Sequence, residues 1–212
     1  MFTGIVQGLC EVVGVEAGDG NRQLTVDLGP LAEGLELGGS VANNGVCLTA
    51  SNIEGSLVRF DVIGETLERT NLSAVGVGDS IDIERSLKFG DELGGHLLSG
   101  HVAGSVKVHD IEVDGDNRTM WFDVPSELMH LLLWKGFVAL DGASLTISRI
   151  DREANRIAVS LIPETLERTT LGSVIVGDQV NLEVDSQTQA IIHAVHEILS
   201  DAELRSQILE AK

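Results

Sequence analysis

An internal repeat constrains the possible fold of this chain more than any other feature of its sequence. The segment ETLERTNL at residues 65–72 recurs as ETLERTTL at residues 164–171, an offset of 99 with seven of eight residues identical. SVANNGVCLTAS at residues 40–51 matches FVALDGASLTIS at residues 137–148 at an offset of 97, and earlier matches run at an offset of 96. These blocks keep one order, which excludes chance similarity. Two copies of one unit therefore form two domains.

The repeat divides the 212-residue chain into four parts. Residues 1–87 and 97–187 are the two copies, residues 88–96 are a linker with three glycines, and residues 188–212 are a tail with no counterpart. Each copy has the size of a small domain with a modest core. The offset changes by two near residues 153–155, a polar stretch where a hairpin loop tolerates an insertion.

Both copies show the pattern of short β-strands. Residues 24–28, 58–62 and 81–84 alternate apolar and polar side chains with a period of two. Asn-Gly at 44–45, Glu-Gly at 54–55 and Asp-Gly at 141–142 predict tight turns between strands. Short strands joined by such turns are typical of a small closed antiparallel barrel, so we expect an all-β protein with one barrel in each copy.

Two segments depart from the β pattern. Residues 125–136 predict a short helix that begins at Pro125 and ends near Gly136. In the tail, an apolar stripe at helical spacing starts after Thr188, and residues 200–203 form a capping-box pattern. This helix either covers the end of a barrel or pairs with other subunits. The stripe consists of Ile191, Ile192, Val195, Ile198 and Leu199.

Composition excludes several classes of function. The formal net charge of −19 argues against nucleic acid and anionic membrane as partners. The apolar runs are too short to span a bilayer, and the N-terminus lacks the pattern of a secretory signal, so we expect a cytoplasmic protein. Cys10 and Cys47 have no metal-binding spacing and are expected to be free thiols. His96 and His101 lack helical metal-ligand spacing, and no nucleotide-binding or zinc motif is present.

Polar positions shared by the two copies are candidates for binding the same ligand. They are Thr49/Thr146, Glu65/Glu164 and Thr66/Thr165. Hydroxyl and carboxylate groups at equivalent places in two barrels suit a polyol or a heterocycle bound once per barrel. For threonine alone, a strand or turn role is the stronger alternative.

Positions that differ between the copies are candidates for chemistry. Cys47 aligns with Ser144, Ser40 with Phe137, Asn44 with Asp141, and His101 with Ile5. Cysteine, serine and histidine together can supply a nucleophile and a proton shuttle. The alternatives are that Cys47 is a small buried apolar residue and that His101 is a structural imidazole.

At these residues the sequence resembles the riboflavin synthase family of the α-subunit type. The matching motifs are MFTGIV, SVANNGVCLT, GGHLLSGHV, KGFVALDGASLT, IPETLERTTLG and DSQTQA, from Met1 to about Ala190. The resemblance implies two six-stranded Greek-key antiparallel barrels and a C-terminal helix, assembled as a homotrimer through the helices. It implies a transferase without a metal or organic cofactor. This enzyme passes a four-carbon unit between two 6,7-dimethyl-8-ribityllumazine molecules, giving riboflavin and 5-amino-6-ribitylaminouracil in the final step of riboflavin biosynthesis. Lumazine synthase is a candidate partner.

The resemblance also implies an active site between the N-terminal barrel of one subunit and the C-terminal barrel of its neighbour. The implied catalytic residues are Cys47, His101 and Ser40 on the N-terminal side, with Thr146 and Asp185 opposite. The two shared glutamates, Glu65 and Glu164, are added to the substrate-binding residues that the resemblance implies. These are Phe2, Gly4, Ile5, Val6, Thr49, Gly64, Thr66, Lys135, Asp141, Ser144, Ile162 and Thr165.

Two other functions fit such barrels. Lumazine and yellow fluorescent proteins resemble this family and bind a chromophore as an optical antenna without catalysis. They have lost the motif of the second barrel and the Cys/His pair, whereas both ETLERT blocks, Cys47 and His101 are present here. A flavin-reductase-like protein would need a nicotinamide-binding α/β domain, for which the chain has no room.

Overall fold

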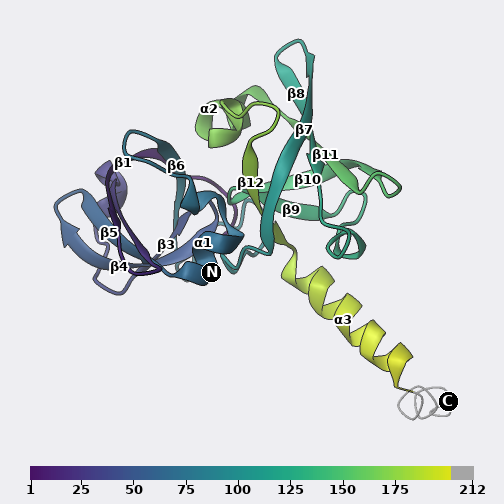
Figure 1. Cartoon of the computed structure of the whole chain (residues 1–212), viewed down its shortest axis with the longest axis horizontal. Coiled ribbons are helices and arrows are strands. Elements are labelled where there is room, and N and C mark those ends of the chain that lie inside the picture. The colour runs from purple at the N-terminus through teal and green to yellow at the C-terminus, as the bar shows by residue number, and fades with distance from the viewer. Residues whose placement is uncertain (202–212) are drawn as a thin grey trace.

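The computed structural model describes residues 1–201 and contains two closed antiparallel β-barrels followed by a helix (Figure 1). The N-terminal barrel consists of β1 (Gly8–Ala17), β2 (Arg22–Asp27), β3 (Ser40–Asn43), β4 (Val46–Glu54), β5 (Leu57–Val62) and β6 (Ser80–Arg85). The C-terminal barrel consists of β7 (Gly104–Asp114), β8 (Asn117–Asp123), β9 (Phe137–Leu140), β10 (Ala143–Asp151), β11 (Arg156–Leu161) and β12 (Gln179–Val184).

The two barrels have the same topology. Neighbouring strands follow the order β1-β2-β5-β4-β3-β6 in the first barrel, and β7-β8-β11-β10-β9-β12 occupy the equivalent places in the second. Each barrel encloses its own apolar core. Val58, Phe60 and Val62 of β5 are fully buried because alternate side chains of a strand point inward. The predicted fold class, two six-stranded Greek-key barrels with a C-terminal helix, is confirmed.

The predicted turns are also confirmed. Asn44 and Gly45 between β3 and β4 have φ of 45° and 78°, and Asp141 and Gly142 between β9 and β10 have φ of 46° and 87°. Two successive residues in the left-handed region form the hairpin turn that matches the twist of the strands. The loop from Asp151 to Arg156 is two residues longer than the loop from Glu54 to Leu57, where the repeat offset changes.

The prediction of a helix over residues 125–136 is wrong. This segment forms a 3-10 turn, η3 (Met129–Leu131), and the chain at Lys135 has a φ of 63°. The Arg152 guanidinium accounts for the difference, because it donates to the carbonyls of Met129 at 2.9 Å and Leu132 at 3.2 Å. The ETLERT blocks, whose conformation the strand pattern did not predict, form the short helices α1 (Gly64–Arg69) and α2 (Pro163–Arg168). Further 3-10 turns are η1 (Gly29–Ala32), η2 (Asn71–Ser73) and η4 (Thr170–Gly172).

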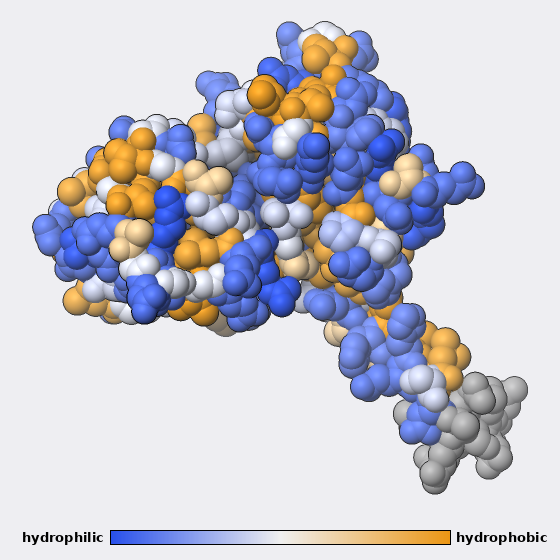
Figure 2. Space-filling view, viewed as in Figure 1, coloured by the Kyte–Doolittle hydropathy of each residue, from blue (hydrophilic) through white to orange (hydrophobic). Residues whose placement is uncertain are grey.

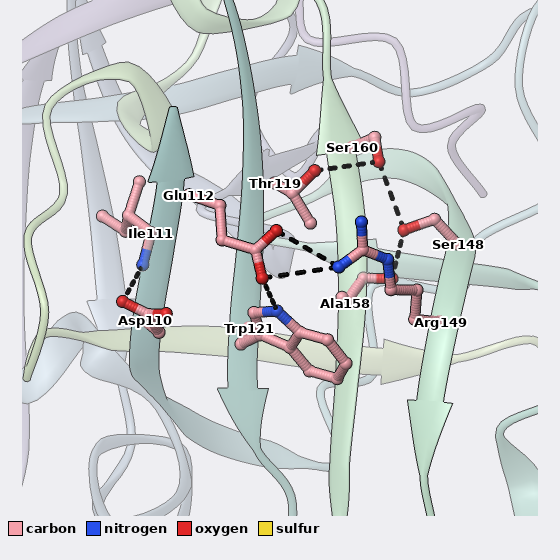
Figure 3. A network of polar contacts seen from close by, with 9 residues as sticks. All are labelled: Asp110, Ile111, Glu112, Thr119, Trp121, Ser148, Arg149, Ala158 and Ser160. Atoms are coloured by element: carbon pink, nitrogen blue, oxygen red, sulfur yellow. Dashed lines mark hydrogen bonds and ion pairs between the residues drawn. The ribbon is translucent and has the colours of Figure 1, made fainter. Parts of the chain in front are cut away.

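A polar network ties together the outer faces of β7, β8, β10 and β11 (Figure 3). The Trp121 indole donates to Glu112 at 2.8 Å, and Arg149 forms an ion pair with the same carboxylate at 3.2 Å. The Ser160 hydroxyl, 3.3 Å from the Thr119 hydroxyl, donates to Ser148 at 3.2 Å. These contacts hold β10, the strand that carries Ser144 and Thr146, against its neighbours.

The C-terminal helix α3 (Ser186–Ser200) leaves the second barrel and projects away from both barrels (Figure 1). It begins two residues before Thr188 because the Asp185 side chain caps its first turn. Ile192 packs against the core of the C-terminal barrel, and the His196 ring stacks on His130 with ring centroids 5.6 Å apart. The capping-box pattern at residues 200–203 extends outside the described residues.

One side of α3 presents an apolar patch (Figure 2). Its exposed apolar side chains are Ile191, Val195 and Leu199. In the part of the chain that the structure describes, no helix combines the length and the apolar character needed to cross a membrane.

Candidate active site

The two barrels pack against each other through the equivalent turns at Gly45 and Gly142. A Cβ atom added to Gly45 would lie 2.6 Å from the backbone nitrogen of Gly142, so only glycine permits this approach. Around the turns, the Asn181 amide donates to the Asn44 carbonyl at 2.9 Å, and the Thr170 hydroxyl donates to Asp82 at 2.9 Å. The interface is therefore polar and nearly symmetric around these turns, and beside them Phe2, Ala42, Leu98 and Ala139 form a small buried apolar cluster.

Asp141, predicted to bind substrate, lies in this interface. Its carboxylate accepts from the Asn181 backbone at 2.8 Å, from the Asn71 amide at 2.9 Å and from the Thr170 hydroxyl at 3.4 Å. Burial is the main cause that raises the pKa of Asp141 well above its usual range, with the nearby Asp82 carboxylate adding to it. These hydrogen bonds show that Asp141 helps to hold the barrels together, and its role in binding substrate stays a prediction.

The first candidate half-site is on the outer face of the N-terminal barrel. Ser40 pairs with Thr49 across β3 and β4, and Ala42 pairs with Cys47, so these side chains share one face. The Cys47 backbone amide donates to the carbonyl of Gly100 at 2.9 Å. This contact brings residues 98–101, a segment that we call a strap and that carries His101, beside Cys47. The structure thus brings together three of the predicted catalytic residues, Ser40, Cys47 and His101.

The second candidate half-site is the equivalent face of the C-terminal barrel. Phe137 pairs with Thr146 across β9 and β10, and Ala139 pairs with Ser144. The Ser144 backbone amide donates to the carbonyl of Gly4 at 2.8 Å, which places the equivalent strap, residues 2–5 with Ile5, at this half-site. Asp185, predicted to be catalytic, follows β12 and accepts from the Thr188 backbone at 3.0 Å as the cap of α3.

His96 belongs to the second half-site, although it was not among the predicted site residues. Its Nδ1 lies 2.7 Å from the Ser144 hydroxyl, and its ring stacks on Phe137 with centroids 4.8 Å apart. His96 is buried, and its Nε2 has no hydrogen-bond partner within the described residues. Burial lowers the pKa of His96, against the opposing effect of Asp185, so the imidazole is neutral at neutral pH. A neutral imidazole can accept a proton.

The signal for His96 was in the sequence, since it stands in the GGHLLSGHV motif. Metal-ligand spacing was the wrong criterion, because the partner of His96 is a serine 48 residues later in the chain. His101 aligns with Ile5 of the first copy, so the histidine of the first half-site has no histidine counterpart there. Each half-site therefore has one histidine from a different position, His101 in the first and His96 in the second.

The remaining predicted residues lie on the short helices and straps. Glu65 and Glu164 are exposed and form ion pairs with Arg69 and Arg168 one helical turn later. Lys135 is also exposed, with its ammonium 5.9 Å from the centre of the Trp134 ring. The side chains that are partly buried or exposed, and so accessible to a ligand, include Thr49, Thr66, Thr146, Ile162 and Thr165, whereas Phe2, Gly4 and Val6 are buried and Gly64 is partly buried.

No group of three or more histidine, cysteine, aspartate or glutamate side chains in residues 1–201 is placed to hold a metal ion. Cys10 and Cys47 are both free thiols. Burial, with a smaller contribution from Asp27, raises the pKa of Cys10 to about 11. Cys10 is therefore unreactive at neutral pH, and Cys47 is the accessible thiol.

Comparison with known proteins identifies the barrels. The family model of the lumazine binding domain matches twice, at residues 3–86 and 99–185. Riboflavin synthase of Escherichia coli strain K12 is 47% identical over 205 residues, covering 96% of this chain and 95% of that protein. Riboflavin synthase of Chlamydia pneumoniae is 43% identical over 203 residues, covering 95% of this chain and 98% of that protein.

Among solved structures, LumP complexed with riboflavin superposes with a TM-score of 0.80 at 27% identity, covering 88% of this chain and 100% of that chain. LumP complexed with 6,7-dimethyl-8-(1'-D-ribityl) lumazine gives a TM-score of 0.78 at 27% identity, covering 87% and 99%. The chain belongs to the riboflavin synthase family, and each of its barrels is a lumazine-binding domain.

Proposed function

We propose that this protein is a riboflavin synthase that transfers a four-carbon unit between two molecules of 6,7-dimethyl-8-ribityllumazine. The observation that carries the proposal is a pair of half-sites that share a backbone frame and differ in their reactive groups. The first has Ser40, Cys47 and His101, and the second has Phe137, Ser144 and His96 with Asp185 nearby. A reaction between two copies of one substrate needs this combination, because the same molecule must be bound twice in different roles.

Each half-site has a different part in the reaction. One lumazine loses a proton from its 7-methyl group, and the resulting carbanion attacks the second lumazine, which has accepted a nucleophile at C7. The neutral His96 is suited to accept a proton, with Ser144 fixing the orientation of its ring. Cys47 and Ser40 supply nucleophilic groups at the other half-site, beside His101. Holding two reactive rings in one orientation contributes up to roughly 7–11 kcal/mol, which removes the need for a cofactor.

A complete site in this proposal comprises the N-terminal half-site of one subunit and the C-terminal half-site of a neighbour. The subunits form a homotrimer through α3, whose apolar patch of Ile191, Val195 and Leu199 is exposed in a single chain. Burying each such side chain contributes about 1.5–3 kcal/mol, enough in sum to hold subunits together.

The decisive test is incubation of the purified protein with the lumazine alone, followed by the absorbance of riboflavin. We expect turnover without added metal or nicotinamide, and no effect of a chelator. Lumazine bound tightly without turnover would instead indicate a binding protein of the antenna type.

A variant tests the role assigned to His96. His96→Phe keeps a ring stacked on Phe137 but removes both ring nitrogens, so turnover should fall at least about 100-fold, the usual contribution of a general base. The thermal unfolding midpoint of the variant should stay near that of the parent. Retained turnover with an intact fold would show that His96 only fills space.

A further inference from the structure

Two equivalent straps connect the barrels. Residues 2–5 precede β1, and residues 98–101 precede β7, at the repeat offset of 96. They pair with each other, because the Phe2 amide donates to the Leu98 carbonyl at 2.9 Å and the Leu98 amide donates back to Phe2 at 3.0 Å. Both side chains are buried. Each strap therefore lies between the two barrels.

Each strap is anchored by a buried glutamate of its own barrel. Glu84 in β6 accepts from the Thr3 amide at 2.6 Å, the Thr3 hydroxyl at 2.8 Å and the Gly4 amide at 3.0 Å. Glu183 in β12 accepts from the Ser99 amide and hydroxyl, both at 2.7 Å, and from the Gly100 amide at 3.1 Å. An ionised carboxylate can accept all three donors, whereas a carboxamide would point its NH₂ group at one of them.

The other side of each strap contacts the opposite barrel. The Gly4 carbonyl accepts from the Ser144 amide of the C-terminal barrel, and the Gly100 carbonyl accepts from the Cys47 amide of the N-terminal barrel. Both glycines have a positive φ, and a Cβ atom on either would lie 2.5 Å from the Cβ atom of its partner. A small displacement of a strap must therefore move the backbone of the residue it contacts.

We infer that Glu84 and Glu183 are positioning residues that act on the opposite barrels. Glu84 of the N-terminal barrel fixes the half-site at Ser144, and Glu183 of the C-terminal barrel fixes the half-site at Cys47 and sets the place of His101. We call this action of each glutamate on the opposite barrel crossing. Its meaning for catalysis rests on the proposed function, whereas crossing itself concerns only the position of the backbone.

A purely structural role makes the opposite prediction. Glu84 pairs with Ala42 and Ala42 pairs with Cys47, so a disturbance that spreads through the sheet from Glu84 reaches Cys47 in its own barrel. In the same way Glu183 connects through Ala139 to Ser144. The barrel in which the effect appears distinguishes the two explanations.

Thiol labelling of the folded full chain with dithiobis(nitrobenzoate) tests the crossing, because Cys47 is the accessible one of the two thiols. Glu183→Gln should speed labelling of Cys47 by about tenfold, the effect of losing one charge-assisted hydrogen bond, and Glu84→Gln should leave it unchanged. In a reporter chain with Cys47→Ser and Ser144→Cys, Glu84→Gln should speed labelling at residue 144, and Glu183→Gln should not. Faster labelling in the barrel that carries the mutation, or equal effects in both, would overturn the proposal.

Milder variants decide the question if a glutamine variant does not fold. Ser99→Ala and Thr3→Val each remove one hydroxyl donor to the anchoring glutamate. Ser99→Ala should raise the rate of labelling at Cys47, and Thr3→Val should raise it at residue 144 of the reporter chain. Unchanged rates at both sites would overturn the proposal.

Kinetics give a second readout. Both glutamine variants should lower kcat about tenfold with a smaller change in KM, because the straps position groups around bound lumazine. A raised KM with kcat unchanged would count against positioning. Crossed labelling in a protein that forms no riboflavin would refute the proposed function alone, and turnover without crossing would refute this inference alone.

Discussion

Replacing Asp82 by asparagine should stabilise the protein above neutral pH. Asp82 is buried between the barrels, and burial is the main cause that raises its pKa from 3.8 to about 7, although hydrogen bonds from Thr170 oppose the shift. The folded state keeps the proton that the unfolded chain releases near pH 3.8. The stability that Asp82 contributes is therefore fully present below that pH and is lost as pH rises through about 7.

The size of the effect follows from the shift. A difference of about three pH units corresponds to roughly 4 kcal/mol, and about half of it falls between about pH 5.5 and 8. Asparagine should fit at this position because Asn181 occupies the equivalent place. There its Oδ1 accepts from the Asn71 backbone N–H at 2.7 Å, just as Asp82 accepts from the Thr170 backbone N–H at 2.8 Å. Asp82→Asn should therefore remove about 2 kcal/mol of the pH dependence across this range.

Urea unfolding of the parent and the variant at about pH 5.5 and 8 measures this difference. Asn181→Asp is the matched reverse control, because it adds a carboxylate beside Asp141 and should lower stability at the higher pH. Asp19→Asn controls for the loss of one surface charge and should change little, since Asp19 is exposed. An Asp82→Asn protein that is less stable than the parent at about pH 8 would refute the reasoning.

Three further predictions concern the core, the chemistry and the assembly. Asn43→Leu should stabilise the N-terminal barrel by about 1 kcal/mol in urea unfolding. The reason is that Asn43 is fully buried with an unpartnered Oδ1, and Leu140 fills the equivalent place in the second barrel. A destabilised variant would contradict this prediction. Cys47→Ser and His101→Gln should lower riboflavin formation by at least about tenfold while lumazine titration shows little loss of affinity, and loss of the fold in both would point to structural roles. Ending the chain after Gln187 should lower both the mass in light scattering and the activity, and a truncated monomer with full activity would rule out a site shared between subunits.

Residue patterns predicted the duplication, the strands and the turns of this protein, whereas the six-stranded Greek-key topology was implied by the family resemblance. Local alternation predicted the strands, Asn-Gly and Asp-Gly predicted the turns, and the repeat predicted equivalent barrels. These features depend on neighbours in the chain, which is why they can be read from it. The helix expected over residues 125–136 failed because the competing interaction comes from Arg152, outside the segment.

The arrangement of the candidate site was decided by tertiary structure. Ser40, Cys47 and His101 were predicted together from their differences between the copies, but the position of His101 near Cys47 depends on a strap that reaches from one barrel to the other. His96 is positioned by Ser144 and Phe137, and Asp141 is held in the interface between the barrels by hydrogen bonds from Asn71 and Thr170.

The sequence by itself determined the duplication, the strands and turns of the barrels, and the family, because each rests on residue patterns that can be read along the chain and compared between its two copies. Tertiary structure alone decided the crossing of the straps and the placing of Glu84 and Glu183 beneath them. These contacts join residues about 80 positions apart, and the straps that they hold lie between barrels that pack together at Gly45 and Gly142. No local pattern encodes how two finished barrels meet.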